Sequence, residues 1–323
     1  MKKFYKICLI TAAVMLLLSF IILGACTIIK SNGWYEEDDI DITLPDYVSL
    51  PGITSSDLHH SNISGHIEID EDDHFSCSFS SSHPTYVGEH QNAQAALGSD
   101  ITKLNFLIGY GKCIISESSD EYVHISANTE HNFQYYTENG TFYLKGFETN
   151  SKHVKFKNYD RNVIYLELPK DLFIKKAELV LGAGEMQIAG LDCDSFEVSV
   201  GAGEFTVDSL NCDSLSASVG AGNLSLKHAV TREADFETGL GNISYTGTIS
   251  GDMNTEVGMG SASFRLNGRQ KSHNYDLTGG MGNITVGESH YGGIAFEEYV
   301  HNEADSTYTL SCAMGSISVE YDD

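Results

Sequence analysis

Apolar and polar residues alternate with a period of two on both sides of Gly201. Residues 195–200 read Ser-Phe-Glu-Val-Ser-Val, and residues 204–208 read Glu-Phe-Thr-Val-Asp. Successive side chains of a β-strand point to opposite faces, so each segment predicts a strand with one buried and one exposed face. The same offsets recur around other glycines. The residues that they predict to point inward are Leu104, Phe106, Ile108, Cys113, Ile115, Leu215, Ala217, Val219, Leu224, Leu226, Ala234, Phe236, Thr238, Ile243, Tyr245, Met253, Val257, Ala262, Phe264, Tyr275, Leu277, Ile284, Val286, Tyr308, Leu310, Cys312, Ile317 and Val319.

A Gly-x-Gly unit separates the two strands of each pair and recurs along the second half of the chain. Four consecutive intervals between units are each 19 residues long, a regularity that is typical of a repeat fold. Two further copies follow at wider spacing, and Gly109-Tyr110-Gly111 is an earlier one. The first residues of the later units are Gly182, Gly201, Gly220, Gly239, Gly258, Gly280 and Ala313.

Each unit is predicted to form a corner at which glycine relieves backbone crowding. The middle residue is apolar in every later unit, so we expect it to point inward, and Ala202→Asp to destabilise the fold while Glu204→Ala is nearly silent. A second corner is expected at residues 192–195 and 211–214, which are rich in Asp, Asn and Ser. Coils of about 19 residues, stacked ~4.8 Å apart, would then share one interior. The sequence therefore predicts an all-β fold, a β-solenoid of stacked coils.

Residues 101–170 resemble shorter antiparallel strands that lead into the stack. Asn139-Gly140 lies between two apolar segments and predicts a hairpin turn. We expect these N-terminal strands to cap one end of the solenoid, because an open end invites edge pairing. The insertion 287–306 and the acidic tail at residues 320–323 are expected to protect the other end.

The N-terminus has the pattern of a membrane anchor. Residues 7–29 contain no charged residue, and as a helix they would span roughly 34 Å. Lys2, Lys3 and Lys6 precede them, which favours a cytoplasmic N-terminus and an extracellular bulk. A cleaved secretory signal is an alternative, and Leu23-Gly24-Ala25-Cys26 also resembles a lipobox in which Cys26 would be lipidated. Each alternative places the rest of the chain outside the cytoplasm.

Three regions are predicted: an anchor at 1–35, an acidic His- and Ser-rich linker or stalk at 36–100 with one loosely structured β element, and the solenoid at 101–323. The linker holds six of the 13 histidines. Imidazoles near acidic residues can bind a transition metal, but their spacing matches no known site, so a solvated tether is favoured. The histidines are His59, His60, His66, His74, His83 and His90.

The glycine units and the coils around them resemble the Toastrack putative-adhesin family of bacterial envelope proteins. The resemblance rests on the GAGE, GAGN and GMGN units, on coils such as NCDSLSASVGAG, and on the ending YTLSCAMGSISVEY, and it covers about residues 101–323. It implies a β-solenoid-like fold. It transfers no catalytic residue, since none is known for the family. Some relatives resemble parts of envelope-stress systems, which implies signalling or scaffolding as an alternative role.

Composition and motifs argue against most kinds of chemistry. The net charge of −26 disfavours nucleic acid, whose phosphates require Lys and Arg. The Gly-x-Gly units precede strands and lack the third glycine of a dinucleotide loop, so no nucleotide is expected. Residues 287–291 resemble a nucleophile elbow but end in Tyr291. Stacked outward acids such as Glu185 and Glu204 could hold cations weakly, although a solvated acidic face is favoured. We therefore predict no catalytic, cofactor-binding or metal-binding residues.

Cys193 and Cys212 lie one coil apart and would fall within disulfide range. A bond is permitted outside the cell. The alternative is a ladder of small residues at a corner, since the next two equivalents are Thr231 and Ser250. The second reading is favoured.

Together these features predict a non-enzymatic, membrane-anchored surface module. Its outward ladders of Ser, Thr, Asn and Glu would contact a cell-wall glycan or a protein. The alternative is a scaffold or sensor of an envelope-stress system that meets another envelope protein.

Overall fold

The computed structural model describes residues 67–69, 75–77, 82–95, 101–147, 162–169 and 172–322. All of them belong to one compact unit of the chain. The predicted anchor at 1–35, with Cys26, lies outside the described residues. Among the residues that are described, no helix has the length and apolar character needed to cross a membrane.

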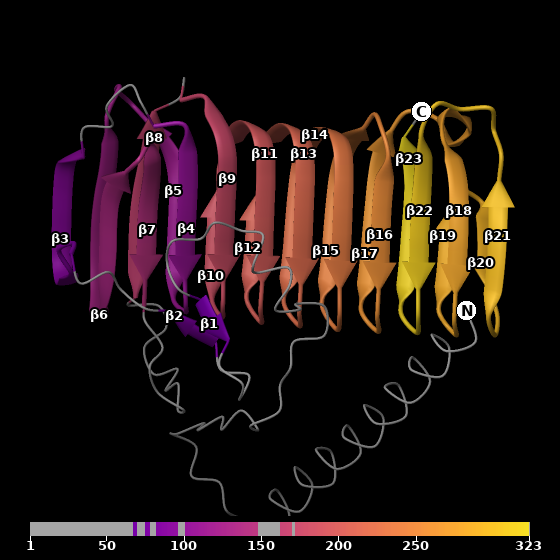
Figure 1. Cartoon of the computed structure of the whole chain (residues 1–323), viewed down its shortest axis with the longest axis horizontal. Coiled ribbons are helices and arrows are strands. Elements are labelled where there is room, and N and C mark those ends of the chain that lie inside the picture. The colour runs from indigo at the N-terminus through magenta and orange to yellow at the C-terminus, as the bar shows by residue number, and fades with distance from the viewer. Residues whose placement is uncertain are drawn as a thin grey trace, which may run out of the picture. The chain divides into compact units, whose positions relative to one another are not determined.

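Strands dominate the described residues, and most of them fall into two rows of parallel strands (Figure 1). The first row holds the strands that precede the Gly-x-Gly turns, and the second row holds those that follow them. In spatial order the first row is β7 (Thr141–Gly146), β4 (Lys103–Ile108), β9 (Ile174–Leu181), β11 (Leu191–Val200), β13 (Leu210–Val219), the second half of β14 (Asn223–Thr238), β16 (Met253–Val257), β22 (Thr307–Cys312) and β18 (Asn274–Gly279).

The second row lies opposite, in the same order. It consists of β8 (Val163–Pro169), β5 (Lys112–Ser118), β10 (Glu185–Ile188), β12 (Glu204–Val207), the first half of β14, β15 (Asn242–Ile249), β17 (Ser261–Asn267), β23 (Ser316–Asp322) and β19 (Asn283–Val286).

The pairing has the predicted repeat. Val200 pairs with Val219 and Glu185 with Glu204, so neighbouring strands are offset by 19 residues. Each coil therefore lies directly on the next. This parallel register confirms the stacked coils that the spacing of the glycines predicts.

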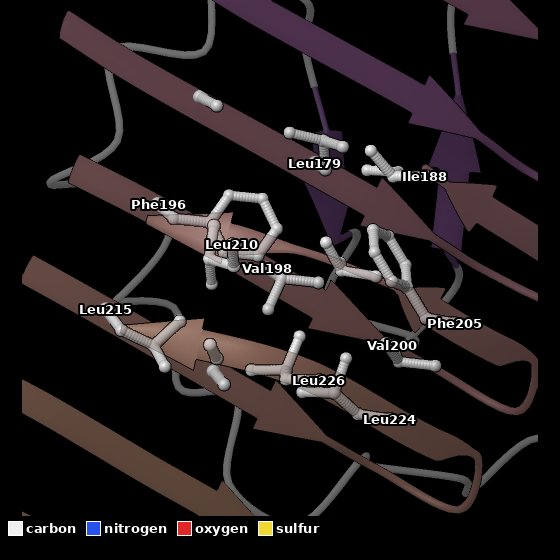
Figure 2. Close-up of a cluster of buried hydrophobic side chains, with 14 of the residues drawn as sticks. Leu179, Ile188, Phe196, Val198, Val200, Phe205, Leu210, Leu215, Leu224 and Leu226 are labelled. Atoms are coloured by element: carbon white, nitrogen blue, oxygen red, sulfur yellow. The ribbon is translucent and has the colours of Figure 1, made fainter. Parts of the chain in front are cut away.

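The core lies between the two rows. Every residue that the alternation predicts to point inward is buried. Figure 2 shows Phe196, Val198 and Val200 from β11 packed with Phe205 from β12 and with leucines of the next coil. One coil cannot bury such a face by itself, so stacking provides most of the hydrophobic stabilisation.

The second glycines of the turns form a column through the stack. A Cβ atom on Gly222 would lie 2.3 Å from the carbonyl oxygen of Gly203, and one on Gly203 would lie 2.6 Å from that of Gly184. The turns are also joined by backbone hydrogen bonds, such as the amide of Asn223 donating to the carbonyl of Gly203 at 2.8 Å. Glycine is needed here because the next turn approaches too closely for any side chain.

The middle residue of the turn points outward, so the inward prediction was wrong. Ala202 and Ala221 are exposed, whereas Gly203 and Gly222 are buried. The inward position at the corner belongs to the second glycine, which has no side chain and therefore left no apolar signal in the sequence. Ala202→Asp would place its charge in solvent and would not destabilise the stack in the way predicted.

The predicted second corner is present, and a third corner was not predicted. The register of β11 skips Asp194, and the inward residues Cys193 and Phe196 are three positions apart. The third corner lies at Ala189-Gly190, between β10 and β11. Each coil therefore has three sides, one of them short.

The register shifts by one residue within one coil and returns to 19 residues at Ala234 and Met253. Leu226 pairs with Tyr245, but Ala229 pairs with Gly247, so the register shifts within this coil. Gly247 has φ +152°, and a Cβ on it would lie 1.8 Å from the carbonyl oxygen of Ala229. Thr231 is equivalent to Cys212 as predicted, but Ile249, and not Ser250, pairs with Thr231.

The N-terminal end is closed by two antiparallel strands, β6 (Val123–Glu138) and β3 (Tyr86–Ala95). The β6–β7 hairpin turns at Asn139-Gly140, both with positive φ, as predicted. Residues 101–118 differ from the prediction, because β4 and β5 pair in parallel with strands on both sides and form a full coil within the stack. The strand β3, in the stretch predicted as a linker, pairs with β6. A separate antiparallel pair comprises β1 (Ile67–Ile69) and β2 (Phe75–Cys77).

The other end is closed by β20 (Ser289–Gly292) and β21 (Phe296–Val300), which pair antiparallel with β19 and β18. This agrees with a capping role for the insertion 287–306. The strand that holds the acidic tail, β23, is not the last of its row, because Ser316–Val319 pair with β19 as well as with β17, while Glu320–Asp322 pair with β17. A turn of 3-10 helix, η2 (Gln270–Ser272), precedes β18.

Candidate functional site

An uncharged strip of hydroxyl and amide side chains covers part of the second row. Each contributing strand has the local sequence Asn/Ser-x-Ser/Thr, whose middle residue is apolar and buried, so the two flanking polar residues point outward. We term this strip the neutral ladder. Its residues, in spatial order from β14 to β15, β17, β23 and β19, are Asn223 and Ser225, Asn242 and Ser244, Ser261 and Ser263, Ser316 and Ser318, and Asn283 and Thr285.

The parallel register fixes the spacing of the neutral ladder. Asn223 pairs with Asn242, and Asn242 with Ser261. Neighbouring parallel strands lie about 4.8 Å apart, so equivalent side chains repeat at that distance along five rungs. A regular array of donors and acceptors on a flat surface suits a ligand that is itself regular.

Hydrogen bonds orient the first row of the neutral ladder. The side-chain amide of Asn242 donates to Oδ1 of Asn223 at 2.8 Å, and the hydroxyl of Ser261 donates to Oδ1 of Asn242 at 2.6 Å. The second position of each triplet in the neutral ladder, from Ser225 to Thr285, carries a hydroxyl group, which can both donate and accept a hydrogen bond. The strip therefore offers both kinds of hydrogen-bonding group to a ligand.

Charged residues border the neutral ladder but do not enter it. Glu204, on β12, pairs with Asn223 and so lies next to the first residue of the neutral ladder. Along one side, Lys227 pairs with Asp208 at 2.9 Å and Arg265 pairs with Glu320 at 3.4 Å. In a chain with a net charge of −26, the two outward positions of the neutral ladder carry no charge on five successive strands.

The outer surface of the first row is acidic by contrast. Lys176 pairs with Glu178 and, at 3.1 Å, with Glu197. Farther along the stack, several outward positions of this row of strands carry carboxylates. We term these residues the acidic face: Asp235, Glu237, Glu256, Asp276 and Glu297. Within the described ranges, no three or more His, Cys, Asp or Glu side chains come together as a group that could hold a metal ion.

The outward acids Glu185 and Glu204 lie in register, as the repeat predicts. However, Nζ of Lys112 lies 2.9 Å from Oε1 of Glu185 and already neutralises that carboxylate. A cation would have to displace this lysine. Glu185 and Lys112 therefore form an ordinary solvated ion pair.

Cys193 and Cys212 are brought together but are not bonded. They pair in register between β11 and β13, both are buried, and both thiols are free. A hydrogen bond between the two side chains and burial raise the pKa of the Cys193 thiol. A thiol held in its neutral form is a poor nucleophile, so the pair has the chemistry of small core residues.

Two of the linker histidines lie among the described residues, and both contact aromatic rings. His83 stacks on Tyr136 with ring centroids 3.7 Å apart, and Nε2 of His90 lies 3.1 Å from the hydroxyl of Tyr135. The other four, His59, His60, His66 and His74, lie outside the described residues.

The sequence at 287–291 forms a turn between two strands and not between a strand and a helix. Ser289 pairs with Val286 in the β19–β20 hairpin, and Nδ1 of His290 lies 3.1 Å from the hydroxyl of Thr285. A nucleophile elbow places its serine at the start of a helix. The resemblance to that motif is therefore local only.

Sequence reasoning found outward polar ladders but did not separate the neutral ladder from the acidic face. The signal was present in the strands after the turns, because five of them carry no charge at either outward position. What the sequence lacked was the spatial order. Only the register shows that the strands at 316–318 and 283–285 continue the strip of the strands at 223–263.

A family model and several solved structures resemble this chain. The model described as Toastrack DUF4097 matches residues 112–294, more than half of the chain. Solved structures include a "putative cell adhesion protein" of Clostridium sporogenes, at 17% identity and a TM-score of 0.36, covering 72% of this chain and 99% of that one. A "putative adhesin" of Bacteroides fragilis has 13% sequence identity and a TM-score of 0.42, and the match covers 73% of this chain and 95% of that one. A "putative adhesin" of Parabacteroides merdae has 14% identity and a TM-score of 0.39, with the same coverage of the two chains. Among curated proteins, none is detectably similar.

Proposed function

The chain belongs to the Toastrack DUF4097 family, and we propose that it is a non-catalytic binding module whose neutral ladder binds an uncharged, polyhydroxylated polymer such as a cell-wall glycan. The observation that carries this proposal is the run of five uncharged rungs of hydroxyl and amide side chains on an otherwise acidic chain. We further propose that residues 1–35 anchor the chain in the cell membrane and hold the rest outside the cytoplasm. Support for this comes from the uncharged segment 7–29 and the lysines before it.

The chemistry of the neutral ladder favours glycan over charged polymers. A single hydrogen bond contributes only about 0.5–1.5 kcal/mol net, so no one rung binds tightly. Several rungs at one spacing act together on a polymer, because each contact raises the effective concentration of the next. Nucleic acids are disfavoured, since the strip has no Lys or Arg with which to meet phosphate.

A pair of matched variants tests the proposal. Ser244, on β15, is an exposed residue in the neutral ladder, and Ser216, on β13, is an exposed serine on the outer surface of the first row. Binding of the full chain to purified cell-wall glycan would be measured for Ser244→Lys and Ser216→Lys. We expect Ser244→Lys to weaken binding about tenfold, a loss of about 1.4 kcal/mol, with Ser216→Lys unchanged. Equal effects of the two changes, or no binding by the native chain, would exclude the neutral ladder as the glycan site. Release of soluble sugar by the native chain would contradict the absence of catalysis.

The acidic face favours a second candidate function, a scaffold that meets a basic partner in the cell envelope. Charged surfaces of opposite sign steer partners together and select among them. The experiment is a pull-down of the full chain from gently solubilised membranes. A stable membrane-protein partner that is lost in Glu256→Lys but retained in Ser244→Lys would support this function. Retention of the partner in Glu256→Lys would exclude the acidic face as its site.

A further inference from the structure

Large apolar side chains line one half of the edge that the Gly-x-Gly turns form. Four of them are the middle residues of successive turns, Leu240, Met259, Met314 and Met281, and Ile294 continues the line. The exposed fraction is 46% for Leu240, 37% for Met259, 60% for Met281 and 88% for Ile294, while Met314 is half-buried. We term these five residues the apolar ridge.

Backbone hydrogen bonds between turns set the residues of the apolar ridge one rung apart. The amide of each middle residue donates to the carbonyl of the first residue in the neighbouring turn, and the turns line up along the lower edge of the view in Figure 1. The bonds are Leu240 to Gly220 at 2.7 Å, Met259 to Gly239 at 2.8 Å, Met314 to Gly258 at 2.8 Å and Met281 to Ala313 at 2.7 Å.

Ile294 belongs to the apolar ridge through the antiparallel cap. The pairing of β18 with β21 brings Gly279 opposite Phe296. The register continues into the loop, where the amide of Ala295 donates to the carbonyl at position 280 at 2.7 Å. This bond holds the loop that carries Ile294 against the turn that carries Met281, at the end of the line.

The fold does not require these large side chains. The corner needs glycine at its second position, whereas the middle residues Leu240, Met259 and Met281 are exposed. The first part of the same edge carries Ala183, Ala202 and Ala221 at equivalent positions and folds in the same way. An exposed run of Leu, Met and Ile adds nothing to folding, and contiguous apolar patches on a soluble surface mark interaction sites.

The surroundings of the apolar ridge limit what can cover it. On one side lies the first row of the neutral ladder, which is uncharged. On the other side Glu237 and Glu256 each precede a ridge residue by three positions. A second copy of this chain would bring two sets of these carboxylates together, on bodies that each carry a charge of −26. The ridge is also a projecting edge, so it offers no groove to a helix or peptide.

We propose that the apolar ridge inserts into the interfacial layer of a phospholipid bilayer. A projecting line of Leu, Met and Ile can reach the headgroup–acyl boundary, about 5–10 Å deep, while the adjoining hydroxyl and amide row bonds to headgroups. The length of chain outside the structure is consistent with this. Only the 37 residues from 30 to 66 separate the proposed membrane segment at 7–29 from the first described strand, so the length of the chain holds the body within about 130 Å of the bilayer. The proposal rests on the turns and does not depend on glycan binding.

The test places a fluorescent reporter on the apolar ridge of the full chain. Trp34 is the one tryptophan of the sequence, so Trp34→Phe gives a silent background. Met259→Trp then reports from the ridge, and Ala202→Trp reports from the small-residue half of the same edge. Both variants would be reconstituted in phosphatidylcholine nanodiscs, with and without bromine on the acyl chains.

We expect the emission of Met259→Trp to be blue-shifted and quenched about twofold or more by brominated lipid, with Ala202→Trp unaffected, because only the ridge reaches the acyl boundary. Equal quenching of the two variants, or none in either, would overturn the proposal. A blue shift without quenching, accompanied by cross-linking between copies, would also overturn it and would assign the ridge to a second copy of the chain.

Discussion

Gly222→Ala should destabilise the stack, because the column of second glycines leaves no room for a side chain. The new Cβ would lie 2.3 Å from the carbonyl oxygen of Gly203 and 2.9 Å from its nitrogen, with Cγ1 of Val200 also at 2.9 Å. Two of these contacts are backbone atoms that cannot rotate away. Relief requires the two turns to separate, which breaks the bond from the amide of Asn223 to the carbonyl of Gly203.

The magnitude follows from two contributions. Overpacking in a well-packed interior costs about 1–3 kcal/mol, and a lost backbone hydrogen bond costs about 1 kcal/mol more. We therefore expect Gly222→Ala to lower the free energy of unfolding by about 3 kcal/mol. Urea unfolding followed by circular dichroism would measure it as a lower midpoint at an unchanged slope.

Ala221→Ser is the matched control, since Ala221 lies next to Gly222 in the same turn but is exposed. Surface substitutions of this kind usually stay within about 0.5 kcal/mol of the native protein. A Gly222→Ala protein as stable as Ala221→Ser would refute the close approach of successive turns.

Two further predictions concern pH and self-association. Burial lowers the pKa of His273, which stacks on Tyr308, below its ordinary value of about 6.5, so the folded state favours the neutral imidazole. The stability that the neutral imidazole provides is fully present above about pH 6.5 and is lost as the pH falls from there toward the folded pKa. The urea midpoint should therefore decline less steeply between about pH 7 and 5 in His273→Gln than in the native chain. Parallel curves for the two proteins would contradict this. Glu298 lies on β21, the terminal strand of this end, and pairs with the core residue Leu277 of β18, so its charge lies on the core side of the strand pair. Glu298→Val should raise self-association in light scattering, whereas Glu297→Val, on the outer surface, should not. Equal scattering from both valine variants would show that the charge at Glu298 does not protect this edge.

Much of the coil could be predicted from the sequence, because alternation and a fixed interval are local signals. The period-two spacing alone predicts that Phe196, Val198 and Val200 lie on the buried face. The equal spacing of Gly182, Gly201 and later glycines requires that they meet in a column if the coils stack. The corner was misread because its inward residue is a glycine, whose missing side chain leaves the exposed middle residue as the nearest apolar signal.

The order of the coils at the two ends could not be predicted. β23 lies between β17 and β19, although it comes last in the sequence, and β5 lies between β8 and β10. An apolar coil face fits any neighbour of the same width, so the local pattern does not identify the partner. The local register shift at Gly247 was missed because the interval from Gly239 to Gly258 is still 19 residues, so the spacing of the glycines does not mark it.

The sequence indicated a polar outer surface for the candidate site but not its division into two faces. The triplets that begin at Asn223 and Asn242 are visibly uncharged. Their continuity with Ser316 and Asn283 depends on the order of the coils. The apolar ridge was hidden by the same error that turned Met259 and Met281 inward.

The central claim, that the neutral ladder binds through uncharged groups, is tested most directly by the salt dependence of glycan binding. The affinity of the full chain for purified cell-wall glycan would be measured at about 0.05 and 0.5 M sodium chloride, where the Debye length falls from about 14 to about 4 Å. Hydroxyl and amide contacts carry no net charge, so we predict affinities that agree within about twofold. A large loss of affinity at high salt would contradict the claim and would assign binding to charged residues outside the neutral ladder.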